Sequence, residues 1–260
     1  MREILEEAQK HRDDGHGRVQ AADAKANALP KRFYRTAGVA PLEGGFAVTL
    51  DGRQTKTPGR KPIIVPSAGL ATVMAEEWAA QGELIDARTM PTVRLVNSAI
   101  ESGEEQVPAF REEVLNFVGS DLLLYRAETP RELVAAEEAA WDAALVKLAR
   151  HFGVAFRPTI GIVHQPQPPA TLAKFTDLLM AENLLVMTSL VAITSITGSG
   201  LLATGLWHQL FTPEEAWSAA HVDEDYNMRL WGEMEEATKR RQQRRTEFDA
   251  AVKLLDFLRS

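Results

Sequence analysis

The longest uncharged stretch of this chain constrains its fold most, because residues 183–213 contain no Asp, Glu, Lys or Arg. Such a segment must be covered by lipid or by the rest of the protein, since about 20 apolar residues can cross a bilayer. Ser and Thr recur through it, Gly198-Ser199-Gly200 interrupts it, and no Lys or Arg cluster flanks it. We predict two buried helices joined at these glycines and no stable membrane insertion. A membrane-associated protein anchored through residues 184–206 is the alternative.

The first part of the chain has the pattern of an antiparallel sheet, which we place at residues 31–66. Phe46, Val48 and Leu50 alternate with smaller or polar residues, as in a strand with one buried face. Asp51-Gly52 follows and is a strong signal for a type I′ hairpin turn. The apolar run at 121–125 is a candidate additional strand of this sheet.

Helical patterns dominate residues 67–260. Ser67, Thr129 and Thr212 are predicted N-caps, the last two followed by proline and glutamate. Residues 222–259 predict one long C-terminal helix, with Val222, Tyr226 and Leu230 anchoring its first part. Residues 1–30 are expected to form a flexible or helical arm. The predicted fold class is α+β, a small N-terminal antiparallel β-rich domain followed by a larger, mostly α-helical domain.

Composition argues against several functional classes. The chain has no cysteine, which excludes disulfides and thiolate chemistry, and its net charge of −7 disfavours binding to nucleic acid. The acidic N-terminus lacks the pattern of a secretion signal or a typical mitochondrial transit peptide. We therefore expect a soluble, intracellular protein.

Catalytic and metal-binding signatures are missing from the sequence. The six histidines are not paired at the spacing of metal ligands, and neither HExxH, GxSxG nor a phosphate-binding loop occurs. We expect no catalytic residue, metal or cofactor, and thus no enzyme. The alternative is a hydrolase or transferase that uses a carboxylate–tryptophan cleft at residues 76–78 or 223–231.

Several short motifs nevertheless stand in a characteristic order. They are Lys31-Arg-Phe-Tyr34, Gly44-Gly-Phe-Ala-Val48, Leu50-Asp-Gly-Arg53, Thr57-Pro58, Ala75-Glu-Glu-Trp-Ala-Ala-Gln-Gly82, Met90-Pro91, Arg94-Leu95, Asn97, Ser120-Asp-Leu-Leu-Leu-Tyr-Arg126, Trp141-Asp142, Asp223-Glu224, Trp231-Gly-Glu233, Glu236-Ala237 and Arg240-Arg241. Together they resemble the assembly chaperones that bind the alpha subunit of the catalytic (F-one) sector of F-type ATP synthase. The resemblance extends from about residue 31 to the C-terminus.

This resemblance implies a function without chemistry. A chaperone of this family holds the newly made alpha subunit soluble until the beta subunit replaces it, and it hydrolyses no nucleotide. Tryptophan is enriched at the energetic centres of protein interfaces, and flanking carboxylates suit a partner that offers Arg or Lys. From the resemblance and these patterns we predict a partner-binding set comprising Glu77, Trp78, Asp223, Glu224, Trp231, Glu233, Glu236 and Arg240.

Overall fold

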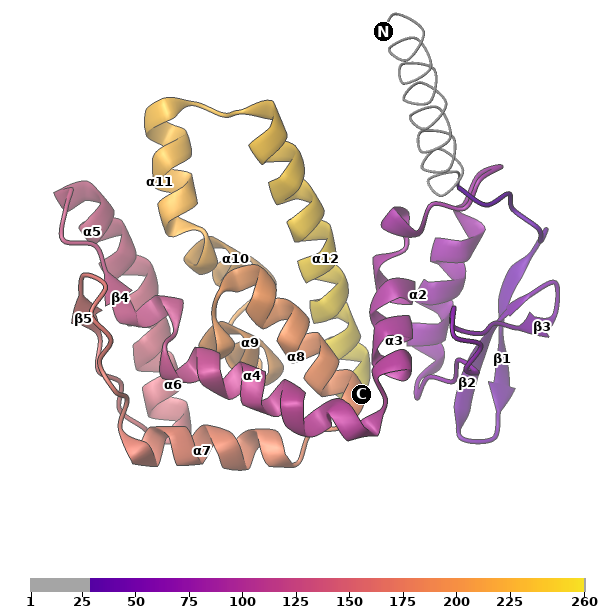
Figure 1. Cartoon of the computed structure of the whole chain (residues 1–260), viewed down its shortest axis with the longest axis horizontal. Helices are drawn as coiled ribbons and strands as arrows, with labels where there is room; N and C mark the ends of the chain where they lie inside the picture. Colours follow the sequence, from indigo (N-terminus) through magenta and orange to yellow (C-terminus); the bar gives the residue numbers. More distant parts are fainter. Residues whose placement is uncertain (1–28, 260) are drawn as a thin grey trace, which may run out of the picture.

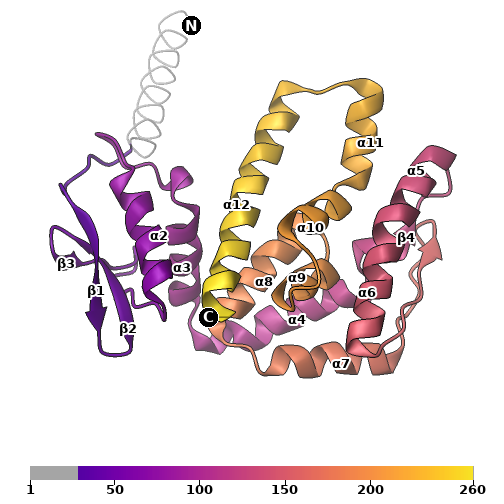
Figure 2. The same cartoon turned by 180° about the vertical axis from the view of Figure 1, so that it is seen from behind.

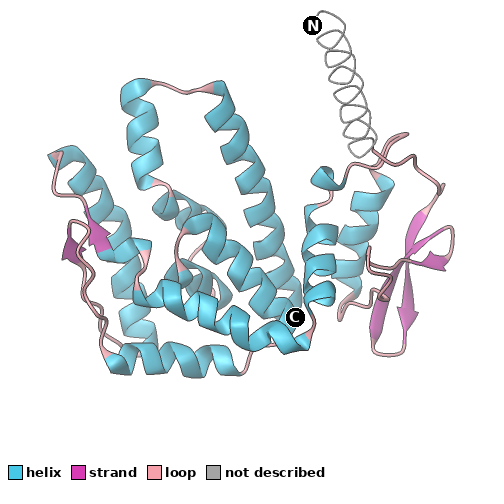
Figure 3. Ribbon diagram, in the orientation of Figure 1, coloured by secondary structure: helices cyan, strands magenta, loops and turns pink. Residues whose placement is uncertain are grey.

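The protein is described by a computed structural model, which covers residues 29–259. The arm predicted for residues 1–30 lies outside the described residues, apart from its last two positions. A small sheet with two helices lies beside a larger helical body, as Figures 1 and 3 show. The predicted α+β class, with the antiparallel sheet first and helices after it, is confirmed.

The N-terminal sheet has three antiparallel strands in sequential order, β1 (Ala37–Leu42), β2 (Gly45–Leu50) and β3 (Arg53–Gln54). Asp51 and Gly52 connect β2 to β3 with φ angles of 48° and 76°. Positive φ at both central residues is the requirement of a type I′ turn, so the predicted hairpin is confirmed. The alternation in β2 buries Val48 and Leu50.

Helix α2 (Ala68–Ala79) covers this sheet, and α3 (Pro91–Ser102) packs against α2 on the side of the helical body. The Ser67 hydroxyl accepts the Leu70 N–H at 3.2 Å, which confirms the predicted N-cap of α2. Leu70 and Met74 are fully buried in a cluster that joins the sheet, α2 and α3 and also includes Leu254. The domain boundary proposed at residue 66 stays a prediction, although the core of the sheet extends into both helices.

The helical body follows, with short 3₁₀ turns and one π turn between its helices. Its elements are α4 (Val107–Gly119), α5 (Arg131–Glu137), the π turn η4 (Glu138–Asp142), α6 (Ala143–Phe152), α7 (Pro169–Met180), α8 (Leu184–Thr197), α9 (Gly200–Trp207), α10 (Pro213–Ala220), α11 (Val222–Trp231) and α12 (Glu235–Arg259). The 3₁₀ turns are η1 (Ala87–Thr89), η2 (Glu104–Gln106) and η3 (Leu122–Leu124).

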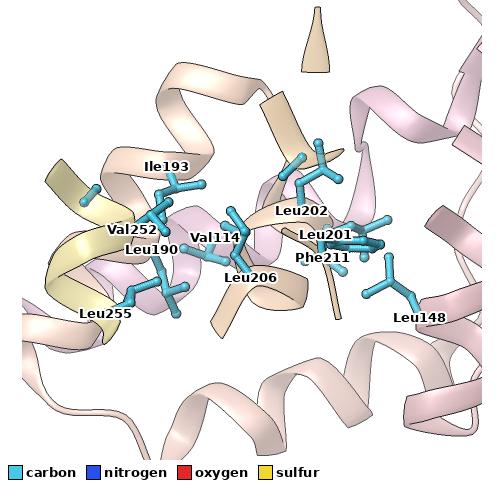
Figure 4. Close-up of a cluster of buried hydrophobic side chains, with 14 of the residues drawn as sticks. Val114, Leu148, Leu190, Ile193, Leu201, Leu202, Leu206, Phe211, Val252 and Leu255 are labelled. Carbon is cyan, nitrogen blue, oxygen red and sulfur yellow. The ribbon is translucent and has the colours of Figure 1, made fainter. Parts of the chain in front are cut away.

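The uncharged stretch forms α8 and α9, as predicted, and both lie in the centre of the helical body. Figure 4 shows Leu190 and Leu201 from these helices among side chains from α4, α6 and α12. A side chain at Gly200 would meet the Val114 carbonyl at 2.7 Å, so the junction permits α4 to approach closely. Among residues 29–259, no helix is long and apolar enough to cross a membrane.

The run at 121–125 does not join the N-terminal sheet. Residues Leu122–Leu124 form a 3₁₀ turn capped by Asp121, whose carboxylate accepts the Leu123 N–H at 3.1 Å. Only β4 (Tyr125–Arg126) is extended, and it pairs in parallel with β5 (Thr159–Ile160). The prediction was wrong because an apolar run of this length does not distinguish a strand from a buried turn.

The two predicted Pro-containing helix starts have different outcomes. At α10 the Thr212 hydroxyl accepts the Glu215 N–H at 3.1 Å, and the Glu215 carboxylate accepts the Thr212 N–H at 2.8 Å. This capping box confirms the prediction there. At α5 the N-cap residue is Pro130 and makes no side-chain bond, so the predicted Thr129 cap was wrong. The helix starts one residue later than that cap requires.

Candidate partner-binding surface

Helices α11 and α12 form a hairpin that rises from the helical body, joined by a short connection at its far end (Figures 1 and 2). The single C-terminal helix predicted for residues 222–259 is therefore wrong. Gly232 has φ of 80°, and its N–H donates to the Met228 carbonyl at 2.9 Å. A glycine in this left-handed region is a common helix terminator, since it carries no Cβ to strain.

The tip of this hairpin exposes three large apolar side chains, which we call the apolar tip. Leu230 is 54% exposed, Trp231 is 84% exposed and Met234 is 73% exposed. The expectation that Leu230 anchors α11 was wrong, whereas Tyr226 on the same helix is buried. An apolar group of this size on a surface marks an interaction site more often than a scattered single residue does.

Charged residues surround the apolar tip. Glu236 and Arg240 form an ion pair at 3.0 Å one turn apart on α12, and their side chains are 83% and 71% exposed. Glu233 is also exposed and lies in the connection. The break at Gly232 means that Trp231 and Glu233 do not share a helix with Glu236 and Arg240, but the connection keeps all four at one end of the hairpin.

Glu224 instead links the two helices of the hairpin. Its carboxylate accepts from Arg244 at 2.7 Å and lies 3.8 Å from Arg241, which pairs with Asp225 at 2.5 Å. The nearby His221 ring is buried, which lowers its pKa. Glu224 therefore has a structural partner on α12, and its role in recognition stays a prediction.

Asp223 faces the other way, toward α5. It lines a groove between α5, β4 and α11 together with the carboxyl group of Glu137. Glu137 is buried, and burial followed by the neighbouring Asp223 raises its pKa. Glu137 was not among the predicted site residues, and its only signal in the sequence is an acidic residue among the apolar positions of a helix.

Glu77 stabilises the start of α3. Its two carboxylate oxygens accept the N–H groups of Thr92 and Val93 at 2.9 and 2.8 Å. These donors need a partner because Met90, at the N-cap, makes no side-chain bond to them. A carboxylate at a helix N-terminus is also favoured by the helix dipole. The structure thus gives Glu77 a clear structural role.

Trp78 lies at the margin of the N-terminal core. Its ring contacts Tyr34 edge-on at 5.6 Å between centroids, and its carbonyl accepts the Tyr34 hydroxyl at 2.7 Å. Both residues line a surface groove of about 510 Å³ with Phe33, whose side chain is 74% exposed. The groove's one carboxylate, Asp51, accepts backbone N–H groups that lower its pKa.

The eight predicted residues therefore fall into four places. Trp231, Glu233, Glu236 and Arg240 gather at the apolar tip, Glu224 lies within the hairpin, Asp223 faces α5, and Glu77 with Trp78 lies on α2. Neither carboxylate–tryptophan cleft is assembled: the Glu77 carboxylate binds the backbone of α3, and Asp223 and Trp231 lie at opposite ends of α11. Within residues 29–259, no cluster of His, Asp and Glu could hold a metal ion.

This arrangement, exposed apolar and charged groups at the end of a helical hairpin, has the composition expected of a protein-binding surface. A family model described as ATP12 chaperone protein matches residues 31–149. A solved structure from Agrobacterium tumefaciens is 40% identical, with a TM-score of 0.85, over 88% of this chain and 87% of that chain. Atp12 from Paracoccus denitrificans is 32% identical, with a TM-score of 0.81, over 88% of this chain and 98% of that chain.

A more distant relative is the mitochondrial protein atp12 of Schizosaccharomyces pombe, 22% identical over 80% of this chain and 75% of the relative. The chain belongs to the ATP12 chaperone family. The resemblance to ATP synthase assembly chaperones, drawn from the motifs between residue 31 and the C-terminus, is thereby confirmed at the level of the family.

Proposed function

We propose that this protein assists the assembly of F-type ATP synthase by binding the unassembled alpha subunit and preventing its aggregation until the subunit pairs with beta. An unassembled subunit exposes the apolar surface that its neighbour covers later, and such surfaces drive aggregation. A chaperone can cover this surface without any chemical step. Bacterial and mitochondrial relatives occur, and we assign this chain to the bacterial cytoplasm, with the mitochondrial matrix as the alternative.

The observation that carries the proposal is the apolar tip. Trp231 is 84% exposed although a tryptophan ring is costly to leave in water, and the Glu236–Arg240 pair lies at the same end of the hairpin. A large apolar ring with charged neighbours has the composition of an interface centre with a polar rim. The end of a two-helix hairpin also presents these groups on a scaffold held by the Arg241–Asp225 and Arg244–Glu224 ion pairs.

The test is to co-express the chain with the alpha subunit of the same organism and measure the soluble fraction of that subunit. We expect Trp231→Ala to lower this fraction at least several-fold without changing the melting temperature, since the ring contributes little to the core. Met180→Ala is the matched control, an exposed apolar residue at the end of α7. Wild-type protein that leaves the alpha subunit insoluble would refute the proposal.

The alternative, an enzyme with a carboxylate–tryptophan cleft, makes a different prediction. Purified protein would then release phosphate or another product from a small-molecule substrate. We expect no steady release of phosphate from ATP once contaminating ATPases have been excluded, because binding alone accounts for the proposed activity. Sustained turnover that co-purifies with the chain through several columns would favour the enzyme.

A further inference from the structure

A second surface lies between α5, the β4–β5 pair and the start of α11. It is a groove of about 450 Å³ on the opposite side of α11 from α12. The residues lining it include Tyr125, Glu128, Glu137, Trp141, Ile162 and Asp223. Figure 1 shows these elements at the edge of the helical body, far from the N-terminal sheet.

The rim of this groove is apolar and open to solvent. Ile162 lines the groove and is 95% exposed, and its neighbours in the chain, Ile160 and Val163, are 68% and 67% exposed. Between the isoleucines lies Gly161, with φ of 77°, and an added Cβ there would come within 2.9 Å of the Glu128 carboxylate. The backbone turn is thus built for glycine, and it presents neighbouring aliphatic side chains to solvent instead of to the core.

The floor of the groove is acidic. Its charged lining residues are three carboxylates, Glu128, Glu137 and Asp223, and one guanidinium, that of Arg126. Arg126 is already engaged, since it pairs with Asp142 at 2.5 Å and stacks over Trp141. The groove therefore carries an excess of negative charge that its own cation does not neutralise.

Glu137 and Asp223 form the most constrained part of this floor. The buried Glu137 carboxyl accepts the Ala127 N–H at 2.7 Å, and Asp223 lines the same groove. Two neighbouring carboxylates repel each other when both are ionised. A cation placed between them would offset this repulsion and allow both groups to be ionised.

We propose that this groove binds an extended apolar segment of the alpha subunit that carries a Lys or Arg side chain, with the cation at Glu137 and Asp223 and the apolar neighbours covering Ile160, Ile162 and Val163. The acidic floor favours a basic side chain by charge complementarity, and the exposed aliphatic rim favours apolar residues on either side of it. This inference rests on the proposed function for the identity of the partner. It adds a second contact, separate from the apolar tip.

The first experiment maps the contact directly with purified full-length protein and purified alpha subunit. A photo-crosslinking amino acid is placed at position 162, and at position 180 as the matched exposed control. We expect the crosslinker at position 162 to label one alpha-subunit peptide that contains Lys or Arg, and position 180 to label none. Labelling only of segments without a basic residue, or equal labelling from both positions, would overturn the proposal.

The second experiment measures affinity for the same alpha subunit. Glu137→Gln keeps an oxygen for the Ala127 N–H and an amide group toward Asp223, so the variant should fold normally. We expect it and Ile162→Asp each to weaken binding by about tenfold, the scale of one lost charged or apolar interface contact. Met180→Asp should bind like the wild type.

The outcomes separate the two proposals. Wild-type affinity in both groove variants, together with weakened binding by Trp231→Ala, would refute the groove and leave the proposed function intact. A wild-type protein that does not bind the alpha subunit would refute both.

Discussion

The Ser199 hydroxyl donates to the Asp121 carboxylate at 2.7 Å, joining the end of α4 to the α8–α9 junction. The second carboxylate oxygen accepts the Leu201 N–H at 2.9 Å, and the first also accepts the Leu123 N–H. Asp121 is completely buried, and burial raises its pKa to about 7, while these hydrogen bonds oppose that shift. One carboxyl group thus satisfies donors from two segments that lie far apart in the sequence.

The first prediction concerns this link. Asp121→Asn should lower the free energy of unfolding by about 2 kcal/mol, because its NH₂ group cannot accept the hydrogen bond that the second oxygen accepts, and a buried donor loses its partner. Urea denaturation measures the change. Ser120→Ala, at the exposed neighbouring position, is the control and should be nearly neutral. A fully stable Asp121→Asn variant would contradict the assignment.

The second prediction concerns pH and Glu137. Because its pKa is raised above the usual value near 4.5, the folded protein binds more protons than the unfolded chain as pH rises from that value to the folded pKa. The stability that this group contributes is therefore full below about 4.5 and is lost as pH rises through the folded pKa. Glu137→Gln should remove this decline.

The measurement is the melting temperature of wild type and Glu137→Gln between acidic and neutral pH. We expect the melting temperature of Glu137→Gln to rise relative to that of the wild type as pH increases. Glu138→Gln, at an exposed neighbouring position on the π turn, is the control for removal of a carboxylate as such. Parallel curves for wild type and Glu137→Gln would show that Glu137 does not titrate differently on folding.

The third prediction concerns Trp78. Trp78→Arg should destabilise the N-terminal region by about 2–3 kcal/mol, since a half-buried aromatic ring that packs on Tyr34 is lost. Trp78→Phe should be nearly neutral, because the buried indole N–H has no hydrogen-bond partner to lose. Thermal unfolding followed by circular dichroism distinguishes the variants. Equal melting temperatures for Trp78→Arg and wild type would contradict the packing argument.

The fourth prediction separates recognition from folding in the hairpin. Glu236→Lys should leave stability within about 0.5 kcal/mol, the value of an exposed i, i+4 pair, and should reduce the soluble alpha subunit in co-expression. Glu224→Lys should instead destabilise the protein, because it faces Arg244 and Arg241. Asp177→Lys, on the exposed face of α7, controls for reversal of charge alone. Full activity of Glu236→Lys across a range of salt would remove Glu236 from the recognition surface.

Features that depend on neighbouring residues were predictable from the sequence. The Asp51-Gly52 turn, the Ser67 cap and the Thr212 capping box each need only a few adjacent groups, and the uncharged stretch could only be buried or inserted in lipid. These local requirements were sufficient to establish the α+β order.

Features that depend on distant residues were not predictable in this way. The apolar run after Asp121 forms a turn in which the Asp121 carboxylate accepts a hydrogen bond from Ser199, 78 residues further along the chain. No residue near position 121 indicates that partner in the sequence. Helical spacing likewise placed Glu233 and Glu236 on one helix, but the break at Gly232 changed their relation. The groove at Glu137 arises only when α5 and α11 pack together. It therefore had no sequence signal of its own.

Helix α12 also has a consequence for how the protein is made. Leu254 packs in the cluster of the N-terminal sheet, and its neighbour Leu255 packs in the cluster of the helical body. Neither core can close until these residues are available, although the sheet itself is complete within the first quarter of the chain. During synthesis the N-terminal hairpin therefore cannot complete its core until α12, which lies near the C-terminus, has been made. Premature termination upstream of α12 would release a chain with two open cores, and the apolar surface that they expose would make this chain a substrate for proteases.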